Sequence, residues 1–218
     1  MHTRNSNSVK KMVLLAMMAA LAYIMMCVFR IPVVMFLKYE PKDVIITIGG
    51  FLFGPLSSFV ISFIVSLVEM VTVSDTGPIG ALMNLLSTCS FACTAALIYK
   101  KNHTIRGAIV ALVAGCVTMV CAMLLWNWLI TPLYLGYDRE VVAGMLVPVF
   151  LPFNLLKGGL NTALVLFLYK PLVTALRKTG FIETREQNAS NSKGGTILLG
   201  LVLLVTCVLL LLAFQGKI

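Results

Sequence analysis

The sequence predicts an all-α membrane protein: a six-helix transmembrane core with one further transmembrane helix appended at the C-terminus. Of its 218 residues, 60% are apolar and only 11% are charged, and the mean hydropathy is +0.99. A soluble domain averages roughly 45–50% apolar and about 25% charged residues. The apolar residues also form runs near the length of about 20 residues that a spanning helix needs. These observations exclude a water-soluble globule and a disordered chain.

The N-terminal apolar run covers residues 12–29. Two lysines precede it, as in a signal peptide, but no small-residue cleavage site follows, so we expect a retained first helix. The next stretch, residues 44–73, is too long for one helix, and a Gly-Pro pair at positions 54 and 55 divides it. A short helix at membrane depth is tolerated only against protein or a cavity. The short first half, residues 44–53, therefore indicates a binding site or, alternatively, a kinked packing helix.

Three further runs complete the predicted core, at residues 79–99, 108–130 and 147–172. A polar segment, residues 183–193, is typical of a linker. The last run, residues 196–214, is uncharged and rich in Leu and Val, which is typical of a lipid-facing anchor. We therefore expect a core at residues 1–175, a polar cytoplasmic linker at 176–194 and an additional transmembrane helix at 195–218.

The basic residues are distributed unequally between the two ends of the predicted helices. Eleven of the 17 Lys and Arg residues fall in gaps on one side and five on the other, where acidic residues offset most of them. Because loops rich in Lys and Arg stay cytoplasmic, we expect a multi-pass cell-membrane protein with a cytoplasmic N-terminus. The basic residues form no continuous face, so the net charge of +9 does not indicate nucleic-acid binding.

Motifs for several reaction classes are absent from the sequence. It contains no G-x-x-x-x-G-K-[ST], H-E-x-x-H or G-x-S-x-G. Both histidines, His2 and His103, lie in polar gaps, which leaves no plausible zinc ligand set. The six cysteines lie in apolar stretches without a C-x-x-C motif, as expected of small buried side chains. We expect neither an enzyme nor a metal site.

Polar residues at membrane depth are the candidate binding groups. Lys157 lies near the middle of its predicted helix, where a lysine costs about 2.5–3.5 kcal/mol to insert. Asn154, Lys157 and Asn161 follow i, i+3, i+7 spacing and share one helix face. This stripe fits a ligand with carbonyl acceptors and amide donors. The alternative is a structural ion pair between Lys157 and Glu69.

Other polar and small residues extend the candidate set. Asn84 and Asn127 lie, like Asn154, in the outer halves of predicted helices; the tryptophans that flank Asn127 are typical of an interfacial belt. The first external loop contains an apolar segment, residues 35–37, that we expect to fold back over something.

In the first helix, Ala16 and Ala20 form a small-xxx-small pair, which permits close approach of another helix.

Four stretches carry a resemblance to a known family. They are residues 36–43 running into Gly54-Pro55, residues 77–84, residues 152–158, and Asn127 before residues 131–134. In these stretches the chain resembles the S components of energy-coupling factor (ECF) vitamin importers, most closely the riboflavin-specific members. The resemblance covers about residues 10–175; the linker and seventh helix depart from the usual six-helix pattern.

This resemblance implies a core that binds riboflavin from outside, beneath the first external loop, as a transported ligand and without a cofactor. It also implies that the Ala16 and Ala20 face docks on a transmembrane coupling subunit, which two ATPase subunits drive. It implies ligand contacts for Asn154, Lys157 and Asn127, whereas Glu40 and Tyr39 match the family pattern less closely.

Riboflavin itself is neutral, flat and amphipathic. Its dimethylbenzene end needs apolar walls such as Phe36 and Leu37, and its pyrimidine edge needs fixed donors and acceptors. A phosphorylated flavin would need more positive charge than one buried lysine. Two alternatives stay open: an S component for another small vitamin, and a structural membrane protein in which Lys157 is merely paired.

Overall fold

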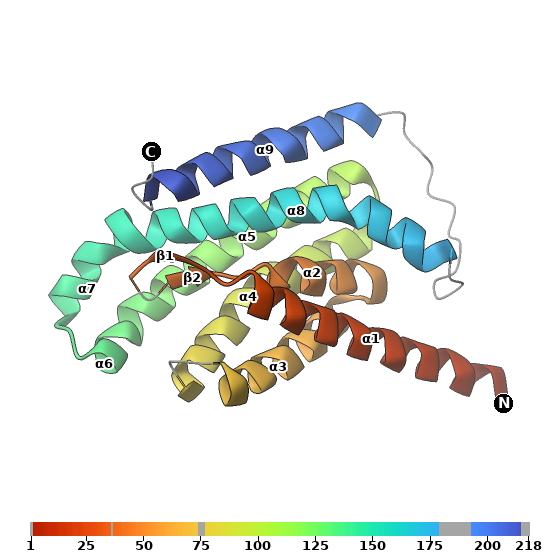
Figure 1. The fold of residues 1–218 in the computed structure, drawn as a ribbon, viewed down its shortest axis with the longest axis horizontal. Helices are drawn as coiled ribbons and strands as arrows, with labels where there is room; N and C mark the ends of the chain where they lie inside the picture. Colours follow the sequence, from red (N-terminus) through yellow and green to blue (C-terminus); the bar gives the residue numbers. More distant parts are fainter. Residues whose placement is uncertain (1, 36, 74–76, 179–192, 215–218) are drawn as a thin grey trace.

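The computed structural model describes residues 2–35, 37–73, 77–178 and 193–214, and nearly all of them are helical. In chain order the elements are α1 (His2–Val28), β1 (Ile31–Val34), β2 (Leu37–Tyr39), α2 (Lys42–Phe53), α3 (Pro55–Thr72), α4 (Gly77–Lys101), α5 (Ile105–Leu129), α6 (Thr131–Leu135), α7 (Arg139–Met145), the π-helical turn η1 (Leu146–Phe150), α8 (Leu151–Lys178) and α9 (Lys193–Phe214). Figure 1 shows α2 in the middle of the bundle and α9 along the outside of α8.

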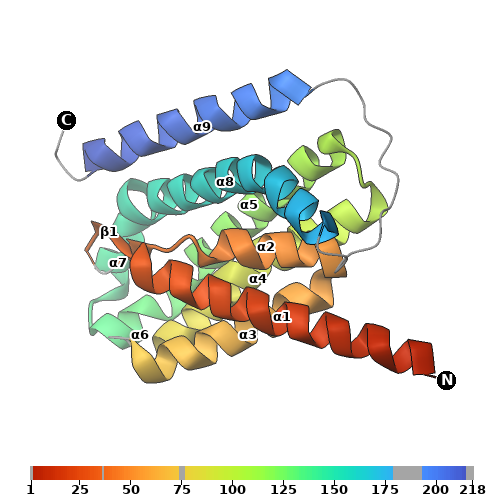
Figure 2. The same ribbon diagram turned by 45° about the vertical axis from the view of Figure 1, so that its right-hand side comes forward.

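The main core forms around α2, which packs against α1, α3, α4 and α8. Small side chains such as Ala22, Ala92 and Ala111 are fully buried there and let the helices approach closely. A second apolar cluster joins the two strands to α7, η1, α8 and Cys207 of α9. Figure 2 shows β1 at the same end of the molecule as α7, with α9 lying across α8.

Five helical segments are long and apolar enough to cross a membrane: Ser8–Val28, Pro55–Thr72, Gly77–Lys101, Ile105–Leu129 and Arg139–Tyr169. The multi-pass membrane class is therefore confirmed. With 12 residues, α2 spans about 18 Å at ~1.5 Å per residue, less than the roughly 30 Å hydrocarbon core. The count of six core spans plus one appended span stays a prediction, and so do the domain limits, because most of the expected linker lies outside the described residues.

The short helix predicted before Gly54-Pro55 is confirmed. Gly54 adopts a φ of 95°, which L side chains rarely adopt, and Pro55 takes the first turn of α3, where a missing N–H costs nothing. Gly50 allows the reversal to be tight, since a Cβ there would lie 2.0 Å from Ser58 Oγ and 2.9 Å from Ala96 Cβ. Gly54 alone therefore separates α2 from α3, and α2 packs against both α3 and α4.

The loop between α1 and α2 is an antiparallel hairpin, so the expectation of a purely helical fold is wrong at this point. Ile31 pairs with Tyr39 and Pro32 with Lys38. Leu37 is 3% exposed and packs in the second apolar cluster, so the prediction that residues 35–37 fold back over the protein is confirmed for Leu37. Met35 instead is 55% exposed, and Phe36 lies outside the described residues.

The predicted gap before the sixth long helix also contains structure. It holds α6 and α7, and the π-helical turn η1 then leads into α8. Pro148 and Pro152 lie in and just after η1, and neither has a backbone N–H to complete a regular α-helical ladder. Sequence periodicity missed these short helices because each is well below the length of a spanning segment.

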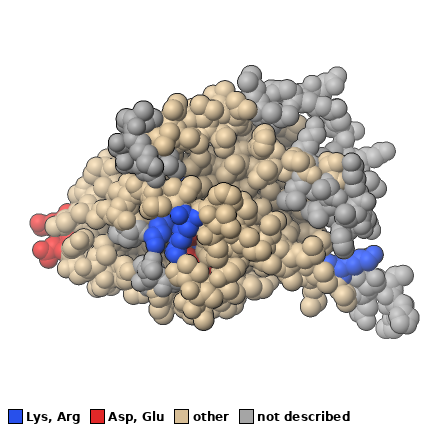
Figure 3. Space-filling view, viewed as in Figure 1, with Lys and Arg blue, Asp and Glu red and all other residues tan. Residues whose placement is uncertain are grey.

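The surface matches a protein that lies in lipid. Figure 3 shows a face almost free of charged side chains, apart from basic groups in a hollow near its middle and at the α1 end, and acidic groups at the α7 end. Apolar residues such as Leu56, Val71 and Val117 are more than half exposed on α3 and α5. Exposing such a surface to water would be unfavourable, whereas lipid tails are as apolar as these side chains.

Candidate ligand-binding site

A cavity of about 230 Å³ lies between the hairpin and helices α4, α5 and α8. Its walls combine apolar, amide, hydroxyl and charged side chains. The lining residues are Arg30, Leu37, Lys38, Glu40, Met83, Asn84, Ser87, Met123, Phe153, Asn154 and Lys157. Small-molecule sites usually measure roughly 300–1,000 Å³ and combine apolar walls with a few placed polar groups. This cavity has that composition at a slightly smaller size.

Asn154 and Lys157 bring an acceptor and a donor to one turn of α8. Asn154 Nδ2 donates to the Phe150 carbonyl oxygen at 2.7 Å, and Asn154 Oδ1 is buried without a hydrogen-bond partner. Lys157 Nζ donates to Ser87 Oγ at 3.0 Å and lies 3.2 Å from Asp43 Oδ2. An ammonium carries three donors, so one remains after these two contacts. Asn154 and Lys157 thus both line the cavity, one with a buried acceptor that has no partner and the other with one donor beyond its two contacts.

The alternative prediction, an ion pair between Lys157 and Glu69, was wrong. Lys157 is paired, but with Asp43 of α2 rather than with Glu69. Glu69 instead pairs with Lys42 and accepts a hydrogen bond from Asn84 Nδ2 at 2.7 Å. The sequence expectation failed because it began the short helix at residue 44 and left Lys42 and Asp43 in the preceding loop, whereas they begin α2 and are 1% and 0% exposed.

A second group of buried charges lies beneath the hairpin. Glu40 accepts from Arg30 Nε at 2.9 Å and lies 2.7 Å from Lys42 Nζ, which also contacts Glu69. Arg30 further donates to the Val73 carbonyl oxygen at 2.9 Å. Buried charges persist when each is paired and hydrogen-bonded, and here two basic groups face two carboxylates. Lys42, at the start of an apolar helix, is the sequence signal that could have indicated this network, since ionisable residues at membrane depth mark functional sites.

Tyr39 does not line the cavity. Its hydroxyl donates to Asn161 Oδ1 at 3.1 Å and ties the end of β2 to α8. Burial raises the pKa of this hydroxyl well above its ordinary value, and the nearby Asp43 carboxylate raises it further. Tyr39 therefore stays protonated and acts as a donor to Asn161.

Asn127 also lies behind the wall. Its Nδ2 donates to the Met123 carbonyl oxygen at 2.7 Å and its Oδ1 accepts from Thr131 at 2.9 Å, which fixes the junction of α5 and α6. The structure thus brings Leu37, Glu40, Asn84, Asn154 and Lys157 together at the cavity and leaves Tyr39 and Asn127 outside its lining.

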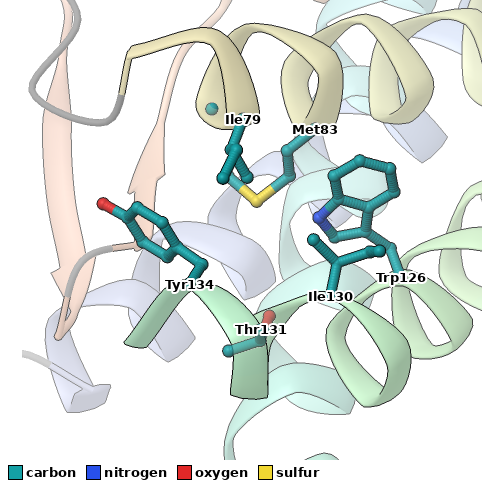
Figure 4. Close-up of a pocket in the computed structure, with 7 residues that line it drawn as sticks. Ile79, Met83, Trp126, Ile130, Thr131 and Tyr134 are labelled. Atoms are coloured by element: carbon teal, nitrogen blue, oxygen red, sulfur yellow. The ribbon is translucent and has the colours of Figure 1, made fainter. Parts of the chain in front are cut away.

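A small apolar crevice of about 10 Å³ adjoins the main cavity through Met83, which lines both. In Figure 4 the side chains of Ile79, Met83, Trp126 and Ile130 face one another, with Tyr134 at one side. Trp126 therefore packs against α4 here, in addition to any role at a membrane interface.

Ala16 and Ala20 lie on the exposed side of α1. Their neighbours Ala19 and Ala22 are buried, at 6% and 0% exposure, and form the side of α1 that packs on the core. The small-residue pair is therefore not part of the protein's own helix packing.

A cavity with apolar walls and a few placed polar groups, in a bundle of apolar helices, is typical of a membrane protein that binds a small solute. Residues 10–169 match the sequence model of one family, described as the substrate-specific component of ECF transporters. The chain belongs to this family, as its sequence resemblance predicts.

Known proteins similar to this chain are also transporters. It is 25% identical to the riboflavin transporter RibU of Staphylococcus aureus, over 80% of this chain and 96% of that protein. It is 27% identical to the riboflavin transporter FmnP of Bacillus subtilis, over 78% and 96%. A solved structure described as the S component of a bacterial ECF transporter superposes with a TM-score of 0.67 at 25% identity, covering 78% of this chain and 99% of that one.

Proposed function

We propose that this chain is the riboflavin-binding subunit of an ATP-driven ECF importer. Two groups one helical turn apart on α8 carry the proposal. Asn154 Oδ1 is an acceptor without a partner, and Lys157 has a donor beyond its two contacts. The pyrimidine edge of a flavin presents an imide N–H between two carbonyl oxygens, which is the complementary pattern. Similarity to two proteins named riboflavin transporters supports the same ligand.

Two of the three basic groups that line the cavity already have carboxylate partners. Arg30 is paired with Glu40, and Lys157 with Asp43. Leu37, Met83 and Phe153 supply apolar wall for a flat ring system. An anionic phosphate would compete with these carboxylates for the basic groups, so we expect riboflavin to bind more tightly than its phosphate ester.

Binding rather than catalysis is the proposed activity, with riboflavin as cargo and no cofactor. Transport needs partners: a transmembrane coupling subunit, docked on the exposed Ala16 and Ala20 side of α1, and two ATPase subunits. The proposed location is the cell membrane, with the N-terminus cytoplasmic, because most basic residues lie on that side.

A fluorescence titration tests this function. The detergent-purified protein should quench riboflavin fluorescence in a saturable way. Asn154→Ala should weaken binding by about tenfold, because the ligand's N–H loses the buried Asn154 acceptor. Asn102→Ala serves as the matched control, since Asn102 lies in the turn between α4 and α5, away from the cavity. It should bind like the wild type.

Two results would contradict the proposal. Saturable binding of a different vitamin, with none of riboflavin, would favour an S component of another specificity. Equal affinity of wild type and Asn154→Ala would remove Asn154 from the site.

A further inference from the structure

The Asp43 carboxylate lies just behind the cavity wall. It is fully buried and is not among the cavity-lining residues. Three side chains from two other helices surround it. Thr88 of α4 donates to Oδ1 at 2.6 Å, while Lys157 and Asn161 of α8 approach Oδ2 at 3.2 Å each.

We propose that Asp43 is a positioning residue for ligand binding, which holds the Lys157 ammonium so that its remaining N–H is available to a carbonyl oxygen of the ligand. This inference rests on the proposed function. A lysine side chain is a flexible four-carbon stem with a rotatable donor group, so a fixed counter-charge reduces the freedom that the ligand would otherwise have to remove.

The geometry makes Asp43 a firm support. Its two oxygens are held by Thr88 and Asn161, and Asn161 is held in turn by Tyr39 at the end of the hairpin. Ser87, the other partner of Lys157, is a neutral hydroxyl on α4 and gives a weaker hold on a cation. Three separate segments, the hairpin, α2 and α4, therefore converge on the position of one ammonium group.

A double-mutant cycle with riboflavin tests the proposal. Asp43→Asn alone should weaken binding by more than about tenfold, as truncating one member of a buried charged pair generally does. In a Lys157→Met background the same change should alter affinity less than about twofold, because there is no ammonium left to position. Equal losses in the two backgrounds, or wild-type affinity of Asp43→Asn, would overturn the proposal.

Thermal unfolding without ligand gives an independent readout. Lys157→Met strands the buried Asp43 carboxylate and should lower the melting temperature, and adding Asp43→Asn should raise it again. Glu69→Gln is the matched comparison: it removes another buried carboxylate, whose basic partners are Lys42 and Arg30 rather than Lys157. The change in melting temperature caused by Glu69→Gln should simply add to the change caused by Lys157→Met.

The two proposals fail in different ways. A wild-type protein that binds no riboflavin overturns the proposed function. The hold of Asp43 on Lys157 is then judged by the ligand-free cycle alone, where recovery of the melting temperature supports it and additive losses overturn it.

Discussion

At the scale of single residues, the site depends on charges that are buried in opposite pairs. Glu40, Lys42 and Asp43 are each under 5% exposed, and each has a partner of opposite charge. Such pairs contribute little net stability, because desolvation offsets the attraction, but removing one partner is strongly destabilising. Substitutions at these positions should therefore affect folding and binding together, and single mutants need a second variant to separate the two.

Tyr39 allows a test of the link between hairpin and bundle. Tyr39→Phe should destabilise the protein by about 1–3 kcal/mol, because Asn161 Oδ1 loses its buried donor. Since the folded-state pKa of Tyr39 is raised above the unfolded value of about 10, this contribution is complete below pH ~10 and declines above it. Thermal unfolding between pH 7 and 11 should show the gap between wild type and Tyr39→Phe narrowing at high pH.

The control for this series is Tyr137→Phe, since Tyr137 is 45% exposed. It should unfold like the wild type at pH 7. The same behaviour from Tyr39→Phe would show that the Tyr39 hydrogen bond contributes nothing to stability.

At the scale of elements, α9 packs closely on α8. A Cβ on Gly159 of α8 would lie 2.8 Å from Cys207 Sγ of α9, and Gly200 of α9 faces the Ala163 carbonyl oxygen. Cys207 belongs to the same apolar cluster as Leu37 and Tyr39 of the hairpin. Helix α9 therefore packs against the hairpin that borders the cavity.

A bulky residue at the contact of α8 and α9 should separate the two helices. We expect Gly159→Leu to destabilise the protein by about 1–3 kcal/mol, the usual cost of overpacking, as measured by thermal unfolding in detergent. Gly144→Leu in α7 is the matched control, because nothing lies within 4 Å of a Cβ there. Identical melting curves for the two variants would show that α9 does not pack at this site.

The exposed side of α1 is the second element with a testable role. Ala16→Leu combined with Ala20→Leu should leave riboflavin binding nearly unchanged and abolish uptake in cells that express the partner subunits, because bulky side chains prevent close helix approach. Ala22→Leu should instead lower the melting temperature, since Ala22 is 0% exposed. Uptake at the wild-type rate in the double variant would exclude this face as the docking surface.

At the scale of the whole molecule, orientation in the membrane decides from which side the cavity is reached. The hairpin, α6 and α7 belong to one end, and the turn between α4 and α5 belongs to the other (Figure 1). Lys100, Lys101 and Arg106 flank that turn. By the positive-inside rule we propose that the turn is cytoplasmic and that the hairpin faces outward.

Cysteine labelling in intact cells tests this orientation. In a background without the exposed Cys27 and Cys121, an impermeant reagent should label Glu140→Cys, at the α7 end. It should label His103→Cys, in the turn between α4 and α5, only after the cells are broken. Labelling of His103→Cys in intact cells would reverse the proposed topology.

The sequence by itself determined the membrane class, the break at Gly54-Pro55, and Asn154 and Lys157 as cavity residues. Each rests on local information: run length, a turn that glycine and proline favour, and the cost of a lysine within an apolar helix. Only the tertiary structure decided that Lys157 pairs with Asp43, that Asn127 and Tyr39 lie behind the cavity wall, and that the first loop is a hairpin. Those outcomes depend on side chains more than a hundred residues apart in some pairs, such as Asn161 with Asp43. Periodicity reports which face of a helix is apolar, but a contact between two buried polar groups depends on how the helices are placed around one another.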